Sequence, residues 1–300
     1  MENLLLRLRQ KEVLVGDGAL GTLLMQRGLK HGEPPESFNL TRPEILEEIA
    51  LMYLEAGAQI VSTNTFGASP LRLEQFGLAE QTEAINRKAV AAVRKAVGDR
   101  AYVSASVGPC AHMLPPAGDA NPEEVRASFL RQIRALIEEG ADMICIETMM
   151  DAREATLALE AVRSIAPRIP AMATMTFGRT SQGYFTLMGS SVAEAARALW
   201  NAGADIVGSN CGEGSDNMVE IAREFCRCSP VPVAIQSNAG LPEAAETGLL
   251  YPETPEYMAK NAAEMVKLGV QIVGGCCGTT PEHIRAIRRM LRGSADGRWT

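Results

Sequence analysis

The sequence predicts an α/β protein of the (β/α)8 or TIM-barrel class, folded as a single domain. Three observations support this class. Short apolar runs rich in β-branched residues occur eight times along the 300 residues, as expected for parallel strands that are buried on both faces. Helical stretches separate these runs. The alternation extends over about 270 residues, which is close to the usual length of such a barrel.

Strands and helices alternate in order along the chain. We expect strands at about residues 13–16, 58–64, 101–107, 142–147, 170–176, 205–210, 232–237 and 270–275. The clearest helices are expected at residues 43–56, 78–97, 122–139, 151–165, 191–202 and 254–268, after a short helix at the N-terminus. Several of them carry start signals, such as Thr41 before Pro43 and Asn121 before Pro122.

One local phrase recurs at the start of four predicted strands. A helical stretch ends in glycine, and an apolar run follows at once, as after Gly57, Gly140, Gly203 and Gly269. Glycine commonly ends a helix because it adopts the left-handed conformation without a Cβ penalty. An open doubly wound sheet is the alternative architecture for such alternation. The count of eight repeats favours the barrel.

Size, charge and cysteine usage exclude several classes of protein. We expect one barrel domain over residues 1–292 and a tail or linker at 293–300. The net charge of -7 and the pI of about 5.2 argue against nucleic-acid binding. No apolar run approaches the roughly 20 residues of a membrane span, and the N-terminus lacks the features of a signal peptide. Seven cysteines without a framework spacing indicate reduced thiols and a cytoplasmic location.

Three cysteines stand at the ends of two predicted strands. Cys211 closes the sixth strand, and Cys276 with Cys277 closes the eighth. Catalytic groups of a (β/α)8 barrel lie at this end of the strands, so the three thiols are expected to meet there. Three protein ligands with an open fourth position are typical of a catalytic zinc, whereas structural zinc is usually closed by four. The sequence therefore predicts a Zn²⁺ site with room for a substrate.

The ligand type indicates the chemistry. Three thiolates outweigh the charge of Zn²⁺, so such a centre keeps a substrate thiol deprotonated and nucleophilic. This favours S-alkylation over hydrolysis, for which zinc sites usually use His, Asp or Glu. Adjacent cysteines in a regular strand point to opposite faces, so the chain must leave strand geometry at that point. Gly274, Gly275 and Gly278 would permit the bend.

The other cysteines have simpler interpretations. Cys145 alternates inward along the fourth strand and is expected in the core. Cys226 and Cys228 are expected to pack or lie at the surface, and Cys110 ends the third strand, where contact with the site is a less favoured alternative. For Cys276 and Cys277 themselves, the alternatives are buried apolar residues or a strained vicinal disulfide.

Six segments resemble the homocysteine S-methyltransferase family. They are residues 16–22, 63–68, 146–148, 210–211, 237–240 and 274–281, including Asn-Cys and Gly-Gly-Cys-Cys-Gly-Thr-Thr-Pro. They span nearly the whole chain, and the double-cysteine motif is highly specific. Within the family they are most similar to the homocysteine-binding domains of cobalamin-dependent methionine synthases. The resemblance implies a barrel that transfers a methyl group to the thiol of homocysteine and forms methionine.

The resemblance also implies roles for individual residues. Zinc would be held by Cys211, Cys276 and Cys277, with the homocysteine sulfur as fourth ligand and Asn238 in that position when substrate is absent. Asp17 and Glu147 would hold the ammonium group, although pairing of either with an arginine is an alternative. Backbone N–H groups around Gly18 and Ala19 would receive the carboxylate. The expected pocket lining is Thr63, Asn64, Phe66 and Asn210.

The resemblance is less specific about the methyl donor. Betaine-dependent relatives carry a tyrosine ligand where Gly67 stands, so betaine is disfavoured. A methylcorrinoid (methylcobalamin) fits best, and because no cobalamin-binding motif is present, it would be carried by a separate corrinoid domain or protein. The alternatives are a sulfonium donor of the S-methylmethionine type acting on homocysteine or a selenol, and a non-catalytic zinc or thiol redox protein.

Overall fold

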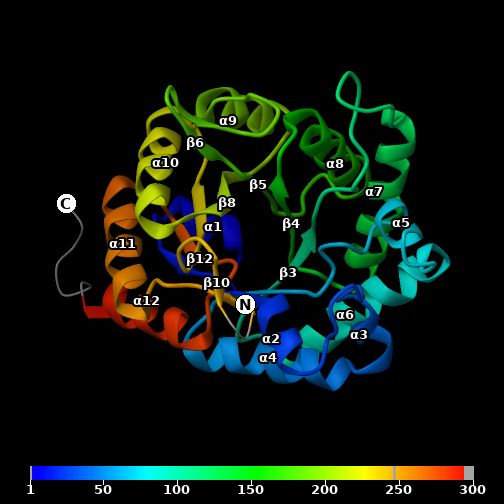
Figure 1. Cartoon of the computed structure of the whole chain (residues 1–300), viewed down its shortest axis with the longest axis horizontal. Coiled ribbons are helices and arrows are strands. Elements are labelled where there is room, and N and C mark those ends of the chain that lie inside the picture. Colours follow the sequence, from blue (N-terminus) through cyan, green and yellow to red (C-terminus); the bar gives the residue numbers. More distant parts are fainter. Residues whose placement is uncertain (1, 246–247, 294–300) are drawn as a thin grey trace.

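The computed structural model describes residues 2–245 and 248–293, which form a closed (β/α)8 barrel (Figure 1). The strands run in the order β1-β12-β9-β8-β5-β4-β3-β2, all parallel, and a bridge between Gly16 and Ile60 joins the two ends. Their bounds are β1 Leu14–Val15, β2 Ile60–Ser62, β3 Tyr102–Val107, β4 Met143–Met149, β5 Ala171–Met175, β8 Ile206–Gly214, β9 Val233–Asn238 and β12 Ile272–Gly275. All eight predicted strands are confirmed, and the alternative of an open sheet is wrong.

Helices surround the barrel in chain order (Figure 1). The outer helices are α2 Leu20–Gln26, α3 Ser37–Thr41, α4 Pro43–Ala56, α5 Pro70–Glu74, α6 Thr82–Val97, α7 Pro122–Glu138, α8 Ala152–Ile165, α9 Val192–Asn201, α10 Ser215–Cys228, α11 Pro255–Leu268 and α12 Pro281–Gly293. The six predicted helices agree with α4, α6, α7, α8, α9 and α11 within a few residues, the largest difference being a 3-10 turn before α6. The boundary of the tail predicted at 293–300 is wrong by one residue, because Gly293 is still part of α12, and residues 294–300 lie outside the described residues.

The four predicted glycine stops follow helices as expected. Gly57, Gly140, Gly203 and Gly269 have φ angles of 104°, 93°, 97° and 111°. Each releases the chain into a buried strand, so the repeated phrase is a structural repeat of the barrel. None of the helices among the described residues has both the length and the apolar character needed to cross a membrane.

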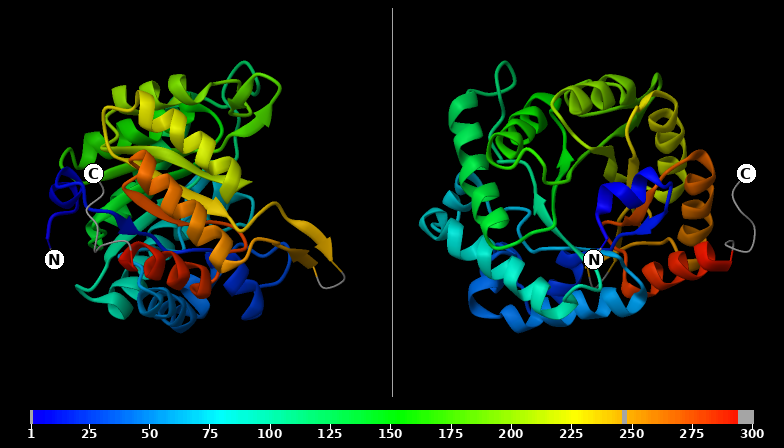
Figure 2. Two further views of the ribbon diagram at one scale, coloured as in Figure 1. Left: turned by 90° about the vertical axis from the view of Figure 1, so that its left-hand side faces the viewer. Right: turned by 180° about the vertical axis from the view of Figure 1, so that it is seen from behind.

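Helix α1 (Leu4–Arg9) closes the end of the barrel opposite the strand C-termini (Figure 2). Leu4 and Leu8 of this helix are almost fully buried against inward side chains of the strands. That inner layer consists of Leu14, Ile60, Tyr102, Met143, Cys145, Met172, Ile206, Ala234 and Ile272. The prediction that Cys145 is a core residue is confirmed. With this end closed by apolar side chains, the barrel interior opens only at the other end.

Two short hairpins in the loops were not predicted. β6 (Gly178–Thr180) pairs with β7 (Gly183–Phe185), and β10 (Glu243–Ala245) pairs with β11 (Gly248–Leu250). The second hairpin projects from the barrel on the side opposite α1 (Figure 2). It leaves β9 at Asn238 and returns to the barrel surface just before α11, beside the predicted metal ligands.

Candidate active site

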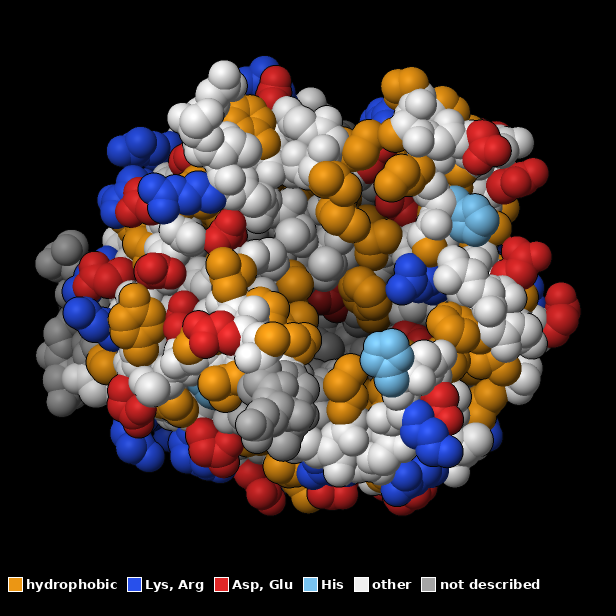
Figure 3. Space-filling view, in the orientation of Figure 1, with side chains coloured by type: hydrophobic (Ala, Val, Ile, Leu, Met, Phe, Trp, Pro, Cys, Tyr) orange, Lys and Arg blue, Asp and Glu red, His pale blue; other side chains and the backbone are white. Residues whose placement is uncertain are grey.

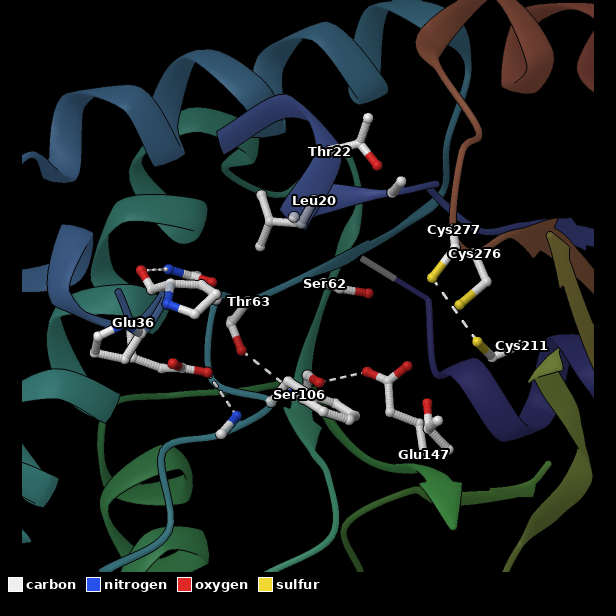
Figure 4. A pocket seen from close by; sticks show the side chains of 18 of the residues that line it. Leu20, Thr22, Glu36, Ser62, Thr63, Ser106, Glu147, Cys211, Cys276 and Cys277 are labelled. Carbon is white, nitrogen blue, oxygen red and sulfur yellow. Dashed lines mark hydrogen bonds between the residues drawn. The ribbon is translucent and has the colours of Figure 1, made fainter. Parts of the chain in front are cut away.

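A cavity of about 560 Å³ opens at the C-terminal ends of the strands. It is visible as the hollow at the centre of the face drawn in Figure 3. Figure 4 shows three thiols on one side of it, Glu36 on the other, and Ser106 with Glu147 between them. Of the predicted site residues, those lining it are Asp17, Gly18, Ala19, Thr63, Asn64, Phe66, Glu147, Cys211, Cys276 and Cys277.

The three predicted metal ligands meet in space. The Sγ atoms of Cys211, Cys276 and Cys277 all lie within 4.8 Å of one another, and those of Cys211 and Cys277 are 3.8 Å apart. No other group of three or more His, Cys, Asp or Glu side chains within residues 2–245 and 248–293 has this spacing. All three cysteines are free thiols, which excludes the vicinal disulfide in this structure.

A bulge in β8 directs Cys211 toward the cavity. Asn210 pairs with Gln236 of β9, but the next pair is Gly214 with Asn238, so β8 has extra residues between them. Cys211 takes a φ of 58°, which is uncommon for a residue with a side chain, and Gly212 follows with 78°. Bulges reorient side chains next to functional sites.

A turn after β12 presents the adjacent cysteines. The strand ends at Gly275, so Cys276 and Cys277 lie outside regular strand geometry, as predicted. A Cβ at Gly275 would lie 2.3 Å from Thr279 Oγ1, and Gly278 has a φ of 77°. The turn is therefore too tightly packed for side chains at these two glycines.

The charges of the three thiols are interdependent. Hydrogen bonds from the thiols of Cys276 and Cys277 lower the pKa of Cys211, while the contacts of Cys276 with Cys211 and Cys277 raise the pKa of Cys276. One thiolate is thus stabilised by two neighbouring thiols. Three sulfur donors suit a soft or borderline metal ion. Because the cluster found among the described residues has three thiols and not four, one coordination position would remain open.

The remaining cysteines lie elsewhere. Cys110 is buried and its N–H donates to Glu154 Oε1 at 2.7 Å, away from the thiol cluster. Cys226 and Cys228 end helix α10, where the first packs against the core and the second is exposed. The less favoured alternative of a site contact by Cys110 finds no support in this geometry.

Asp17 and Glu147 are carboxylates held by neutral groups. Asp17 Oδ2 accepts from Ser62 N at 2.6 Å and its Oδ1 from Ser62 Oγ at 3.0 Å. Glu147 accepts hydrogen bonds from Ser106 Oγ and, at 3.3 Å, from Asn210 Nδ2. Glu147 lies within a bulge of β4, between Ile146 and Met149, and precedes Thr148, whose φ is 58°.

No cationic side chain within residues 2–245 and 248–293 pairs with either of these two carboxylates. Among the described residues, the ion pairs formed by Lys and Arg include neither Asp17 nor Glu147, so the alternative of an arginine partner is wrong for this structure. Burial raises the pKa of Asp17 to about 6. Burial, helped by repulsion from Asp17, raises the pKa of Glu147 to about 7. A bound cation would reverse both shifts.

Three predicted residues have partners within the protein. The N–H of Ala19 donates to Thr279 Oγ1 at 3.0 Å, whereas the N–H of Gly18 has no acceptor among the described residues. Asn238 Oδ1 accepts from Cys277 N at 3.1 Å. Asn210 is fully buried and lies behind the cavity wall rather than lining it, which differs from the prediction.

Sequence reasoning missed several supporting residues. Ser62 and Ser106, which hold the two carboxylates, are common residues within apolar strands and carry no motif. Glu36 Oε1 accepts from Gly67 N at 2.6 Å, and Arg72 lines the same end of the cavity. Tyr251 packs against Gly278 and hydrogen-bonds the thiol of Cys277. Only Glu36, within the polar segment before α3, offered a signal.

A closed (β/α)8 barrel with three thiols and two unpaired carboxylates at its open end has the architecture of an enzyme with a thiolate metal site. Residues 14–291 match the homocysteine S-methyltransferase family. The chain belongs to this family.

Similar proteins agree with this assignment. A methionine synthase of Mycobacterium tuberculosis is 34% identical to this chain over 94% of its length. A methionine synthase of Mycobacterium leprae is 32% identical over 98% of its length. The chain spans about a quarter of these relatives (25% of each). The metallated form of the homocysteine methyltransferase MmuM from Escherichia coli matches with a TM-score of 0.79 and 25% identity, over 96% of this chain and 99% of that one.

Proposed function

We propose that the chain transfers a methyl group to the sulfur of L-homocysteine and forms L-methionine. The observation that carries the proposal is the shared cavity, which holds three thiols and two carboxylates that form no ion pair in the described part of the chain. Homocysteine is complementary to both sets of groups. Its thiol suits the site of the three cysteines, and its ammonium group suits the two carboxylates. Thr63, Asn64 and Phe66 line the same cavity.

The proposed metal is Zn²⁺, held by Cys211, Cys276 and Cys277. Their sulfur atoms provide the donor type and the number that a catalytic zinc uses. When bound there, zinc would supply a position at which a substrate thiol is held deprotonated near neutral pH. Asn238 is proposed as the fourth ligand without substrate, because its side chain lies against the thiol cluster, where it contacts the thiol of Cys211 and the N–H of Cys277.

The head of the amino acid is proposed to bind at Asp17, Glu147 and Gly18. The two carboxylates accept hydrogen bonds from the ammonium group, which neutralises charge that burial disfavours. The N–H of Gly18, which has no acceptor among the described residues, receives the substrate carboxylate. The N–H of Ala19 already donates to Thr279, so Ala19 lines this part of the site without donating to the substrate. Fixing the head aims the sulfur at the donor, and such positioning is itself a large part of catalysis.

A methylcorrinoid on a separate domain or protein is the donor we favour. The curated relatives are named methionine synthases and are about four times as long as this chain. Betaine is disfavoured because Gly67 offers no side-chain ligand at the position where betaine-dependent relatives carry a tyrosine. The second candidate is a sulfonium of the S-methylmethionine type, kept open by the likeness to a homocysteine methyltransferase over 99% of that chain. Seven free thiols fit a cytoplasmic enzyme.

The test combines metal analysis with a donor panel. The purified chain is loaded with zinc and given L-homocysteine with methylcobalamin or with S-methylmethionine, and methionine is measured. We expect one zinc per chain and methionine from methylcobalamin. Methionine only from S-methylmethionine selects the second candidate. Stoichiometric zinc with no methionine from either donor, and no effect of homocysteine at the metal, would point to the non-catalytic thiol protein.

A further inference from the structure

The side-chain amide of Asn210 lies between the Glu147 carboxylate and the thiol cluster. It is fully buried at the end of the regular part of β8. Its Nδ2 is 3.3 Å from Glu147 Oε2 and 3.8 Å from Cys276 Sγ. One nitrogen therefore contacts both a proposed ammonium ligand and a proposed metal ligand.

Chemistry fixes the orientation of this amide. Its Oδ1 accepts from Thr148 N at 2.8 Å and from Thr174 Oγ1 at 2.6 Å. A backbone N–H can only donate, so the oxygen, and not the NH2 group, must face Thr148. The NH2 group is then forced to face Glu147, Cys276 and the hydroxyl of Thr148, to which it donates at 2.8 Å.

The NH2 group has more acceptors than hydrogens. Two N–H bonds serve a carboxylate oxygen, a hydroxyl oxygen and a sulfur, so the three acceptors compete. A carboxylate oxygen is a stronger acceptor than a sulfur, and the 3.8 Å contact to Cys276 is the longest of the three. A cation that binds Glu147 weakens the hydrogen bond between the Asn210 amide and Glu147. One N–H of the amide then becomes available to Cys276.

The amide also joins two unusual turns. Thr148 and Cys211, both with φ of 58°, are the residues that follow Glu147 and Asn210. Such backbone conformations persist only where surrounding contacts hold them. The bonds from Asn210 to Thr148 hold the first turn, and Asn210 itself precedes the second.

We propose that Asn210 is a positioning residue that couples the amino-acid site to the thiol cluster. Occupation of Glu147 by an ammonium group shifts one Asn210 N–H toward the Cys276 sulfur. The sulfur then donates less charge to a bound metal. This inference rests on the proposed function, because it takes Glu147 as the ammonium site and Cys276 as a metal ligand.

The test uses Co²⁺ as a spectroscopic probe and L-norvaline as the ligand. Norvaline has the ammonium and carboxylate of homocysteine but a methyl group in place of the thiol, so it cannot bind the metal. Its binding is measured by calorimetry, and the thiolate-to-cobalt charge-transfer band is recorded with and without it. In the wild-type chain we expect the band to move to higher energy when norvaline binds, because a hydrogen bond withdraws charge from sulfur.

Two variants separate coupling from structural support. Asn210→Asp keeps the acceptor for Thr148 N and Thr174 Oγ1 but loses both N–H donors, so norvaline should leave the band unmoved. Asn210→Ser, also without an NH2 group, replaces it if the aspartate variant does not fold. Thr174→Val is the matched control. It removes one bond to the same amide on the oxygen side, so the norvaline shift should remain.

The outcomes distinguish this inference from the proposed function. Norvaline binding with an unmoved band in the wild type, or a full shift in Asn210→Asp or Asn210→Ser, overturns the coupling and leaves the proposed function intact. A chain without a thiolate-to-cobalt band, or one that does not bind norvaline, contradicts the proposed function and the coupling with it.

Discussion

Cys211 and Cys277 are 66 positions apart in the chain, yet their sulfur atoms lie 3.8 Å from each other. The contact depends on strand order, because β9 is the single strand between β8 and β12. It also depends on two local departures from strand geometry, the bulge at Cys211 and the turn after Gly275. The barrel brings the ends of these strands together, and the local distortions aim the thiols at one point.

Replacing one thiol should remove the metal site. In Cys276→Ala only two sulfur ligands remain, so we expect zinc content to fall from one per chain to near zero and methyl transfer to be lost. Cys228→Ser is the matched control, because Cys228 is exposed at the end of α10 and remote from the cluster. Full zinc stoichiometry in Cys276→Ala, measured after dialysis against chelator-free buffer, would contradict the ligand assignment.

Glu147→Gln should separate substrate binding from metal binding. The substitution removes a negative charge facing the proposed ammonium site but leaves all three thiols. A charge-assisted hydrogen bond contributes about 1.5–3 kcal/mol, so homocysteine should bind roughly 10- to 150-fold more weakly. Zinc affinity, measured by competition with a chelator, should change by less than about threefold. An equal loss of both affinities would instead assign Glu147 a structural role.

Much of the fold could be predicted because its signals are local. A glycine stop followed by a β-branched run marks four of the strands. The positive φ angles of these glycines confirm that each adopts the left-handed conformation that ends a helix. Gly16, Gly18 and Gly21 have the Gly-x-Gly-x-x-Gly spacing that is typical of nucleotide-binding open sheets, yet they lie in a closed barrel, so this spacing alone does not indicate the fold. Closure depends on the pairing of β1 with β12 together with the bridge from Gly16 to Ile60, which no short window of sequence reveals.

The site was predictable where function demands an unusual residue type. Adjacent cysteines at a strand end are rare, and their role follows from ligand chemistry. Asn210 was predicted to line the pocket, but its amide lies behind the cavity wall and contacts Glu147 and Cys276. No feature of the sequence indicates this placement. Ser62 and Tyr251 were missed because a serine in a strand and a tyrosine after a hairpin have ordinary structural uses.

The contribution of Glu147 to the stability of the metal-free, substrate-free protein should fall as pH rises toward 7. The pKa of Glu147 is raised from 4.5 to about 7, so between these values the native state holds a proton that the unfolded chain releases. The free energy of unfolding therefore decreases with pH across this window, by up to about 3 kcal/mol from this group. Asp17, raised from 3.8 to about 6, acts in the same direction at lower pH.

Urea denaturation of reduced protein at about pH 5 and about pH 8 measures this effect. Glu147→Gln cannot ionise, so its free energy of unfolding should decline less than that of the wild type between the two conditions. Saturating norvaline should reduce the decline in the wild type, because its ammonium group compensates the buried charge. Parallel declines in the wild type and the variant would show that Glu147 is not the group responsible.

The close contact between Gly278 and Tyr251 should make Gly278→Ala damaging to the metal site. A Cβ there would lie 2.0 Å from Tyr251 Cγ, and the φ of 77° already disfavours a side chain. The left-handed backbone costs about 1–2 kcal/mol with alanine, and displacing the packed ring adds about 1–3 kcal/mol. Because Cys277 is the preceding residue, we expect the shift of the turn to weaken metal binding as well.

Gly189→Ala provides the comparison that isolates the contact. Gly189 has a φ of 85°, yet a Cβ there would meet no atom within 4 Å. Both variants therefore carry the same backbone strain, and only Gly278→Ala displaces Tyr251. We expect each to lower the free energy of unfolding and only Gly278→Ala to lower Co²⁺ affinity, by about tenfold or more in a chelator titration. Equal Co²⁺ affinity in the two variants would mean that the turn at Gly278 does not control the position of the Cys277 sulfur.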